Sequence, residues 1–236
     1  MKQTLFLMVL IALVATGGSL VAQEVNDIQA EQLGQDTAQQ ALQEVSISRF
    51  EDPGFWRTYV PHDAGVITHR RLEGGPMDKE PIEAEVAAGI DIPDDYVLGI
   101  KTEFFRRGIT NIYVEAIRPL PVPGIAKTLS VWVVGRNFNH ELYAIIRDQF
   151  GNQGQLYMGR MNFSGWRRMT TAIPPNIMQR NVHYPHLAGI EILGFLIRPA
   201  MLETYGSYYV YFDDLRVMTD LFTEESRDPD DMVDGW

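Results

Sequence analysis

Cysteine is absent from the 236-residue sequence, so no disulfide stabilises the fold and no thiolate acts as a nucleophile or metal ligand. Long apolar runs are also scarce, because no segment beyond the first 22 residues approaches the roughly 20 apolar residues that span a bilayer. The sequence contains no Gly-x-Ser-x-Gly elbow, no glycine-rich phosphate loop and no His-Glu-x-x-His. These absences predict a protein without catalytic activity or cofactor that depends on a hydrophobic core.

Positive charge is in short supply: 20 Lys and Arg face 31 Asp and Glu, which gives a net charge of −11. Such a chain is a poor partner for nucleic acid or an anionic membrane surface. The basic residues are mostly arginines, which are enriched at protein interfaces, whereas lysines are few. The acids concentrate in residues 220–234. This pattern indicates either a basic-leaning body and an acidic tail that join head to tail, or ordinary surface ion pairs with a solvated tail.

The first 22 residues have the three parts of a secretory signal. Lys2 supplies the positive start, Leu5 to Ala15 is apolar, and Ala22 is a small residue at the expected cleavage site before Gln23. The apolar part is shorter than a membrane-spanning helix. We therefore expect a cleaved signal peptide over residues 1–22 and export to the periplasm, with a retained anchor as the alternative.

Three further segments follow. Residues 23–44 are rich in Gln, Ala and acids, with no clean apolar stripe at helical spacing, which indicates a linker, or a helix or arm that orders against a neighbouring subunit. Residues 45–218 are long enough for one large β domain. Residues 219–236 form an acidic C-terminal tail.

The central segment alternates β-forming stretches with turn residues, which predicts eight or nine strands in a jelly-roll sandwich, an all-β fold. Residues 60–95 contain several Pro and Gly and are predicted to be loop, and residues 118–124 are too proline-rich for a central strand. The predicted strands are Val45–Phe50, Val97–Phe105, Asn111–Ile117, Thr128–Val134, Glu141–Arg147, Leu156–Met158, Phe163–Met169, Ile190–Arg198 and Tyr208–Val217.

Five motifs in this order resemble the galactose-binding-like jelly roll of carbohydrate-binding modules, over residues 45–218. They are Phe50-Glu51-Asp52 with Trp56, Leu129 to Gly135, Asp148 to Gly151, Phe163 to Arg167, and Tyr211 to Leu215.

Together with the signal peptide and the absence of an enzyme site, the chain is similar to the flagellar filament outer layer, or sheath, proteins of spirochaetes. That family coats the periplasmic flagellar filament around a flagellin core. The resemblance implies a non-catalytic sheath protein that docks on the flagellin core and on neighbouring sheath subunits, and that changes filament stiffness or curvature. The alternative is a periplasmic carbohydrate-binding protein with a glycan ligand.

The likeness to carbohydrate-binding modules also implies a structural calcium ion. In those modules an acid near the first strand and an Asp of the last strand often hold Ca²⁺, and Glu51, Asp213 and Asp214 occupy the matching positions. The alternative is that Asp213 or Asp214 accepts hydrogen bonds from loop N–H groups or pairs with an arginine.

The aromatic and arginine residues give the candidates for interaction. Trp132 and Trp166 lie within strand patterns and are predicted to be core residues. Tyr143 and Tyr157 are candidates for an exposed platform, suited to either a sugar or a subunit contact. The remaining candidates are Arg167, Arg168 and Trp236, an aromatic residue in the acidic tail that would anchor on another subunit.

Overall fold

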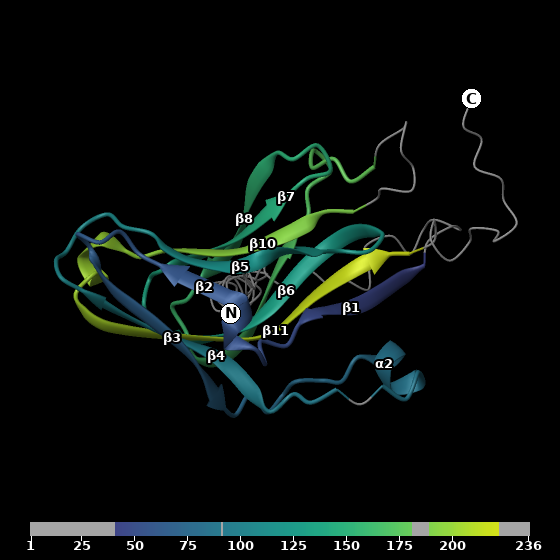
Figure 1. Ribbon diagram of the computed structural model, residues 1–236, viewed down its shortest axis with the longest axis horizontal. Helices are drawn as coiled ribbons and strands as arrows, with labels where there is room; N and C mark the ends of the chain where they lie inside the picture. The colour runs from purple at the N-terminus through teal and green to yellow at the C-terminus, as the bar shows by residue number, and fades with distance from the viewer. Residues whose placement is uncertain (1–40, 91, 181–188, 222–236) are drawn as a thin grey trace, which may run out of the picture.

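Two antiparallel β-sheets packed face to face make up the protein (Figure 1). The computed structural model describes residues 41–90, 92–180 and 189–221. The predicted signal peptide, most of the Gln-rich segment and residues 222–236 with Trp236 lie outside the described residues. No helix in the described part of the chain is long and apolar enough to cross a membrane.

The first sheet has six strands in the order β3-β4-β11-β6-β9, with β1 also paired to β11, and the second has five in the order β2-β5-β10-β7-β8. The strands of the first sheet are β1 (Leu42–Ser48), β3 (Gly65–Glu73), β4 (Tyr96–Phe104), β6 (Ile125–Arg136), β9 (Ser164–Ala172) and β11 (Gly206–Asp220). Those of the second are β2 (Trp56–Tyr59), β5 (Ile112–Pro121), β7 (Glu141–Arg147), β8 (Gln153–Arg160) and β10 (Glu191–Arg198). The helical segments are η2 (Pro53–Phe55), α2 (Glu83–Ala87) and η3 (Met201–Glu203).

The predicted jelly-roll sandwich is confirmed, but the prediction of loop across residues 60–95 is wrong. Residues 65–73 form β3, which pairs with β4 along its whole length, and residues 83–87 form α2. The apolar residues of β3 do not alternate cleanly, because this edge strand is largely exposed, and its pattern therefore gave a weak signal. The first and last strands of the chain also extend slightly further than expected, because Leu42 pairs with Asp220 where β1 meets β11.

The proline-rich stretch, residues 118–124, is partly strand, although its composition was taken to exclude a central strand. β5 continues to Pro121 and pairs there with β10. Its other neighbour, β2, pairs only with residues 113–116. Prolines 119 and 121 are therefore tolerated, since the strand has one open side at that point and fewer backbone N–H groups must be paired.

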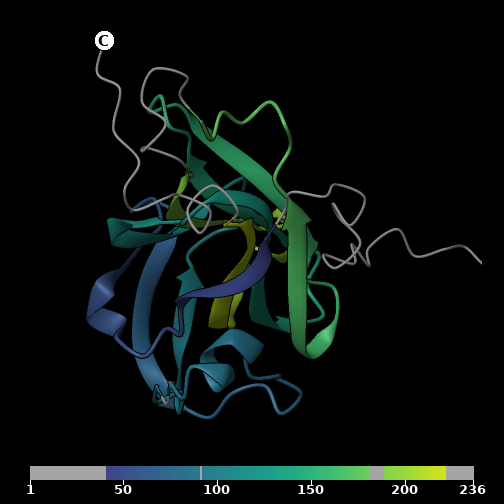
Figure 2. The ribbon, with the colours of Figure 1, turned by 90° about the vertical axis from the view of Figure 1, so that its right-hand side faces the viewer.

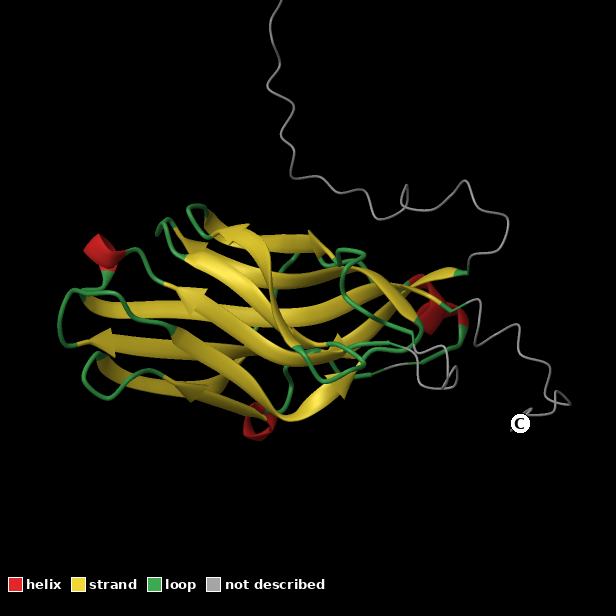
Figure 3. Ribbon diagram, turned by 90° about the horizontal axis from the view of Figure 1, so that it is seen from above, coloured by secondary structure: helices red, strands yellow, loops and turns green. Residues whose placement is uncertain are grey.

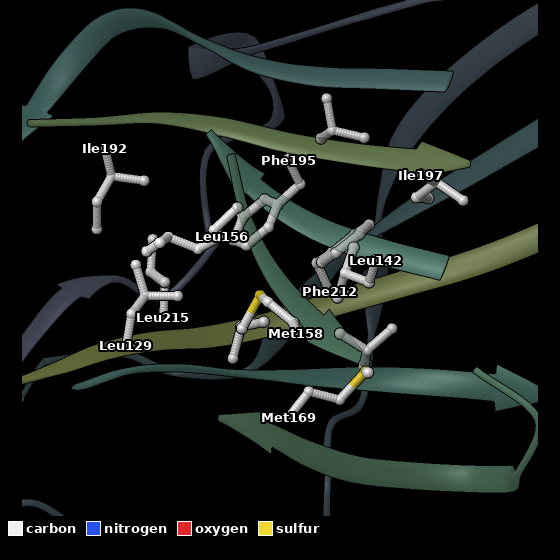
Figure 4. Packing of buried hydrophobic residues seen from close by; sticks show 14 of the residues in the cluster. Leu129, Leu142, Leu156, Met158, Met169, Ile192, Phe195, Ile197, Phe212 and Leu215 are labelled. Carbon is white, nitrogen blue, oxygen red and sulfur yellow. The ribbon is translucent and has the colours of Figure 1, made fainter. Parts of the chain in front are cut away.

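The core lies between the sheets and is built by strand alternation. Val131 and Val133 point inward from β6 and are fully buried, as is Phe212 of β11. Stacked aromatic rings contribute to the core: the Phe50 ring lies 4.6 Å from the Trp56 ring and 6.1 Å from the Phe212 ring. Figure 4 shows Phe195 and Phe212 among the aliphatic side chains of both sheets.

β11 runs the length of the sandwich and changes neighbour on the way. Its first half pairs with β4 as far as Phe212, and its second half pairs with β1 from Leu215 onward. Asp213 and Asp214 therefore fall in the notch between β4 and β1, and Asp214 has a positive φ of 51° where the strand bulges. On that edge of β11, the backbone of Asp213 and Asp214 therefore pairs with neither β4 nor β1.

The two ends of the sandwich differ. Figure 1 shows β11 running from the left end to the right end, where it finishes beside β1. Figure 2 looks at the right end and shows α2 beneath β1. In Figure 3 the helical turn at the far left is η3, at the opposite end from α2.

Candidate functional site: an aromatic surface and a charged notch

A row of tyrosines crosses the outer face of the second sheet. Tyr59 is opposite Tyr113, Tyr113 is opposite Leu196, Leu196 is opposite Tyr143, and Tyr143 is opposite Tyr157. One residue from each of the five strands thus lies in a single register row, which spans about 19 Å at the usual spacing of strands. We call Tyr59, Tyr113, Tyr143 and Tyr157 the tyrosine row.

The rings of the tyrosine row pack against one another in pairs, and the outermost rings are exposed to solvent. The Tyr59 and Tyr113 rings stack at 4.4 Å, and the Tyr143 and Tyr157 rings lie 5.3 Å apart. Leu196, between the two pairs, is 1% exposed, whereas Tyr59 and Tyr157 at the two edges are 39% and 50% exposed. Large rings that are already ordered bind a partner with little loss of conformational entropy.

Charged residues flank the tyrosine row on both sides. Arg57 pairs with Glu115 at 2.7 Å, and Tyr59 donates to the Glu115 carboxylate at 3.3 Å. On the other side Tyr143 donates to Glu141 at 2.8 Å, while the Arg198 guanidinium lies 4.7 Å from the Tyr143 ring. Burial and the nearby carboxylates raise the pKa of Tyr59 and of Tyr143. Both hydroxyls therefore stay protonated and act as hydrogen-bond donors at neutral pH.

Of the predicted interaction residues, the structure brings Tyr143 and Tyr157 together but places the arginines elsewhere. Arg167 and Arg168 are on β9 of the first sheet. The Arg167 guanidinium covers the Phe163 ring at 4.4 Å, and Arg168 binds Glu44 and Ser130. Tyr59 and Tyr113 were missed, because only the pairing of strands distant in sequence aligns them with the other two.

The prediction that Trp132 and Trp166 are core residues is wrong. Both are half-buried, and neither belongs to the buried core. Val131 and Val133, on either side of Trp132, face the core, so alternation puts Trp132 on the outer face of the first sheet. Met169 of β9 is buried, so alternation along that strand puts Trp166 on the opposite, outer face.

Trp166 lines a groove of about 650 Å³ on the outer face of the first sheet. Tyr211 and Arg136 also line it, and the Arg136 guanidinium lies 5.5 Å from the Tyr211 ring. Gly99 of β4 lies beneath two of the lining side chains, because a Cβ there would meet Leu72 at 2.5 Å and the Tyr211 ring at 3.1 Å. This groove is separate from the tyrosine row, which is on the other sheet.

The three predicted calcium ligands lie near the notch in β11, where each acid has a protein partner. Lys79 Nζ lies 2.7 Å from Asp213 and 2.6 Å from Asp94. Arg216 pairs with Asp214 at 2.7 Å. Glu51 instead accepts a hydrogen bond from the Tyr96 backbone N–H at 2.9 Å. The pairing of Asp214 with Arg216 is the alternative to calcium binding that the sequence also suggested.

Burial sets the electrostatics of the notch. It raises the pKa of Asp213 to about 6, against the opposing effect of the Lys79 ammonium. Burial alone would lower the pKa of Lys79, but the bonds to Asp213 and Asp94 outweigh it and raise that pKa. Within residues 41–90, 92–180 and 189–221, no three His, Asp or Glu side chains gather closely enough to hold a metal ion. Calcium binding by Glu51, Asp213 and Asp214 stays a prediction.

Solved structures similar to this chain include carbohydrate-binding modules. The family 11 module of the Clostridium thermocellum cellulase Lic26A-Cel5E is 11% identical, with a TM-score of 0.41 over 76% of this chain and 96% of the module. The module TmCBM61, solved with β-1,4-galactotriose, is 12% identical, with a TM-score of 0.38 over 72% of this chain and 89% of the module. Likeness at this level says nothing of a ligand for this chain.

Sequence relatives give a closer match. A flagellar filament outer layer-like protein of Brachyspira hyodysenteriae is 36% identical over 203 residues, which cover 86% of this chain and 91% of the relative. The flagellar filament outer layer protein of Treponema pallidum is 28% identical over 105 residues, 41% of this chain and 30% of that protein. The sequence model of the flagellar filament outer layer protein FlaA matches residues 21–227. The chain therefore belongs to the flagellar filament outer layer protein family.

Proposed function

We propose that this protein is an exported, non-catalytic subunit of the outer layer of the periplasmic flagellar filament, and that it docks through the tyrosine row. The observation that carries the proposal is the alignment of four tyrosines, from four of the five strands of the second sheet, in one register row of a chain of the outer layer family. Tyrosine and arginine are enriched in protein interfaces, particularly among the residues that contribute most to binding.

The surface around the tyrosine row suits an extended protein partner. It follows the face of a fully paired sheet and carries both signs of charge, from Arg57 and Glu115 at one side to Arg160 and Glu141 at the other. Mixed charges at the rim of an aromatic patch fix orientation more than they add affinity. The partner is the flagellin core or a neighbouring outer layer subunit, and contact along the filament would add stiffness or change its curvature.

Immunogold electron microscopy of periplasmic flagella purified from the source cell tests the location. Antibody against this protein should label the filaments along their length. Bare filaments, with the protein recovered from the soluble periplasm, would refute the proposal.

A second function is favoured by the groove on the first sheet. Half-buried Trp166 and Tyr211 beside Arg136 offer ring faces and a hydrogen-bond donor, which is the chemistry that binds a pyranose ring. Calorimetric titration with oligosaccharides tests this function, with Trp166→Ala as the variant. Binding that this substitution abolishes would support a glycan site. The same heat of binding in the wild type and the variant, or no heat of binding in either protein, would contradict it.

A further inference from the structure

Five large apolar side chains are exposed at the end of the sandwich where β11 begins. They lie on two loops, the one between β4 and β5 and the one between β10 and β11, and their exposed fractions range from 52% to 89%. We call them the end cluster: Phe105, Ile109, Met201, Leu202 and Tyr205. Large groups of neighbouring exposed apolar side chains on a protein surface mark interaction sites.

The two loops of the end cluster are fixed to one another. Thr204 is fully buried between them and accepts a hydrogen bond from the Gly108 N–H at 2.9 Å. Its hydroxyl also lies 2.8 Å from the Met201 carbonyl, which holds η3 in place. The Arg107 guanidinium lies 5.3 Å from the Tyr205 ring, across the two loops. The cluster is therefore already formed in the single chain.

Two arginines adjoin the end cluster. Arg106 pairs with Asp63, but both side chains are more than 60% exposed, so water weakens the pair and a new partner can compete for the arginine. Among the described residues, no carboxylate lies within 4.0 Å of Arg107. The end cluster thus offers apolar area together with a guanidinium that is open to an acidic ligand.

The complementary chemistry lies beyond the other end of β11. Tyr205 directly precedes β11, and residues 222–236 follow soon after its end at Asp220. Those 15 residues contain six acids and one arginine, so their net charge is 1 − 6 = −5. They also contain four large apolar residues, Phe222, Met232, Val233 and Trp236. Residues 222–236 thus combine acids that can pair with the arginines beside the end cluster and apolar side chains that can pack against it.

We infer that residues 222–236 of one copy bind the end cluster of a second copy, so that the subunits join head to tail. β11 has 15 residues and separates the two surfaces by roughly 50 Å. Residues 222–236 would have to be almost fully extended, at about 50 Å, to return to the cluster of their own chain. A second copy placed end to end brings the two together without that cost in entropy.

A head-to-tail contact leaves one free end on each copy, and such contacts build open chains. This geometry suits subunits lined up along a filament, and for that setting the inference rests on the proposed function. The contact itself uses neither the tyrosine row nor the filament. A membrane surface is the less favoured occupant of the end cluster, because the chain carries a net charge of −11.

Analytical ultracentrifugation of the full chain without filaments tests the inference. One variant carries Ile109→Asp and Leu202→Asp at the end cluster, where both side chains are at least 72% exposed and the fold should tolerate the change. A second carries Met232→Ser, Val233→Ser and Trp236→Ser. The matched control is Phe150→Asp, a side chain that is 57% exposed on the turn between β7 and β8.

The wild type and the control should form concentration-dependent oligomers, and each of the two variants alone should associate at least about tenfold more weakly. Mixed together, the two variants should form a heterodimer and stop there, because one supplies an intact end cluster and the other an intact acidic segment. A monomeric wild type, oligomers that both variants retain, or a mixture that stays monomeric would overturn the inference. So would binding to anionic vesicles through the end cluster without self-association.

Discussion

The Tyr143 and Tyr157 rings lie 5.3 Å apart because the two residues oppose each other in the register of β7 and β8. They differ in what else holds them. Tyr143 is half-buried against the row and bonds to both Glu141 and Arg198, whereas Tyr157 is 50% exposed at the sheet edge. One ring therefore supports the surface, and the other is available to a partner.

This difference predicts unequal effects on folding. Tyr143→Ala should lower the free energy of unfolding by about 2 kcal/mol, because it removes packing over Leu196. Tyr157→Ala should lower it by less than about 1 kcal/mol, since much of that ring is already in water. Urea unfolding followed by tryptophan fluorescence measures both. Equal losses would mean that the two rings do not differ in this way.

Gly194 sets the register on which the tyrosine row depends. It lies at the bulge of β10 with φ of 144°, and a Cβ there would be 2.2 Å from the Val114 carbonyl oxygen. Gly194→Ala should therefore cost about 1–3 kcal/mol from backbone strain alone. The control is Gly154→Ala in β8 of the same sheet, where a Cβ would meet Ile146 at an ordinary 3.7 Å. Thermal melting of both variants checks this, and a melting temperature for Gly194→Ala as high as that of the control would contradict it.

Lys79 neutralises the buried carboxylate in the notch, since Asp213 is 1% exposed. Lys79→Met should destabilise the protein by roughly 3–5 kcal/mol at pH 7, because it leaves that charge without its partner. Lys101→Met is the matched control: Lys101 and its partner Glu103 are 44% and 59% exposed, and its loss should change stability by less than about 0.5 kcal/mol. Similar unfolding free energies for the two variants would show that the buried pair is not important for folding.

The same ion pair bears on calcium. Since Lys79 and Arg216 already neutralise Asp213 and Asp214, removal of calcium with a chelator should leave the melting temperature unchanged. A rise in melting temperature on adding calcium, absent in Asp213→Asn, would instead establish the calcium site expected from the sequence.

His140 should make stability depend on pH. The ring packs between Phe138 and Tyr208, and burial lowers its pKa to about 4, although Glu203 lies 3.3 Å away and opposes the shift. In the unfolded chain the pKa is about 6.5. The stability that neutral His140 provides is thus fully present above pH 6.5 and is lost as the pH falls towards 4, by about 2 kcal/mol between pH 7 and pH 5.

Asp213 acts in the opposite direction over the same range. Its pKa is raised to about 6, so the folded state takes up a proton first and gains stability as the pH falls. A comparison with His140→Phe, which keeps a ring at that position, isolates the histidine effect. The unfolding free energy of the variant should fall about 2 kcal/mol less than that of the wild type between pH 7 and pH 5. Parallel pH curves would refute the assignment to His140.

Local sequence signals were sufficient for most strands but not for the surfaces that they form. The strand at Glu141–Arg147 was predicted with the bounds it has in the structure, because apolar residues and flanking turns define it. β3 was missed because an exposed edge strand lacks a clean apolar alternation. Trp132 and Trp166 were misassigned because alternation fixes which residues share a face, not which face is buried.

The candidate site was less predictable than the fold. Tyr143 and Tyr157 lie 14 residues apart on a hairpin, so their proximity was within reach of the sequence. Their alignment with Tyr59 and Tyr113 depends on strand pairings that span much of the chain and on the bulge at Gly194. Nothing in the local sequence specifies that register.

The central claim is that the tyrosine row binds the filament, and co-sedimentation with filaments from cells that lack this protein tests it most directly. The variant replaces Tyr59 and Tyr157 with Ala, and the control replaces Tyr209 on the first sheet, which is 40% exposed against 39% for Tyr59. Wild type and control should sediment with the filaments, and the double variant should bind at least about tenfold more weakly while remaining folded. Equal binding by the double variant and the wild type would contradict the account.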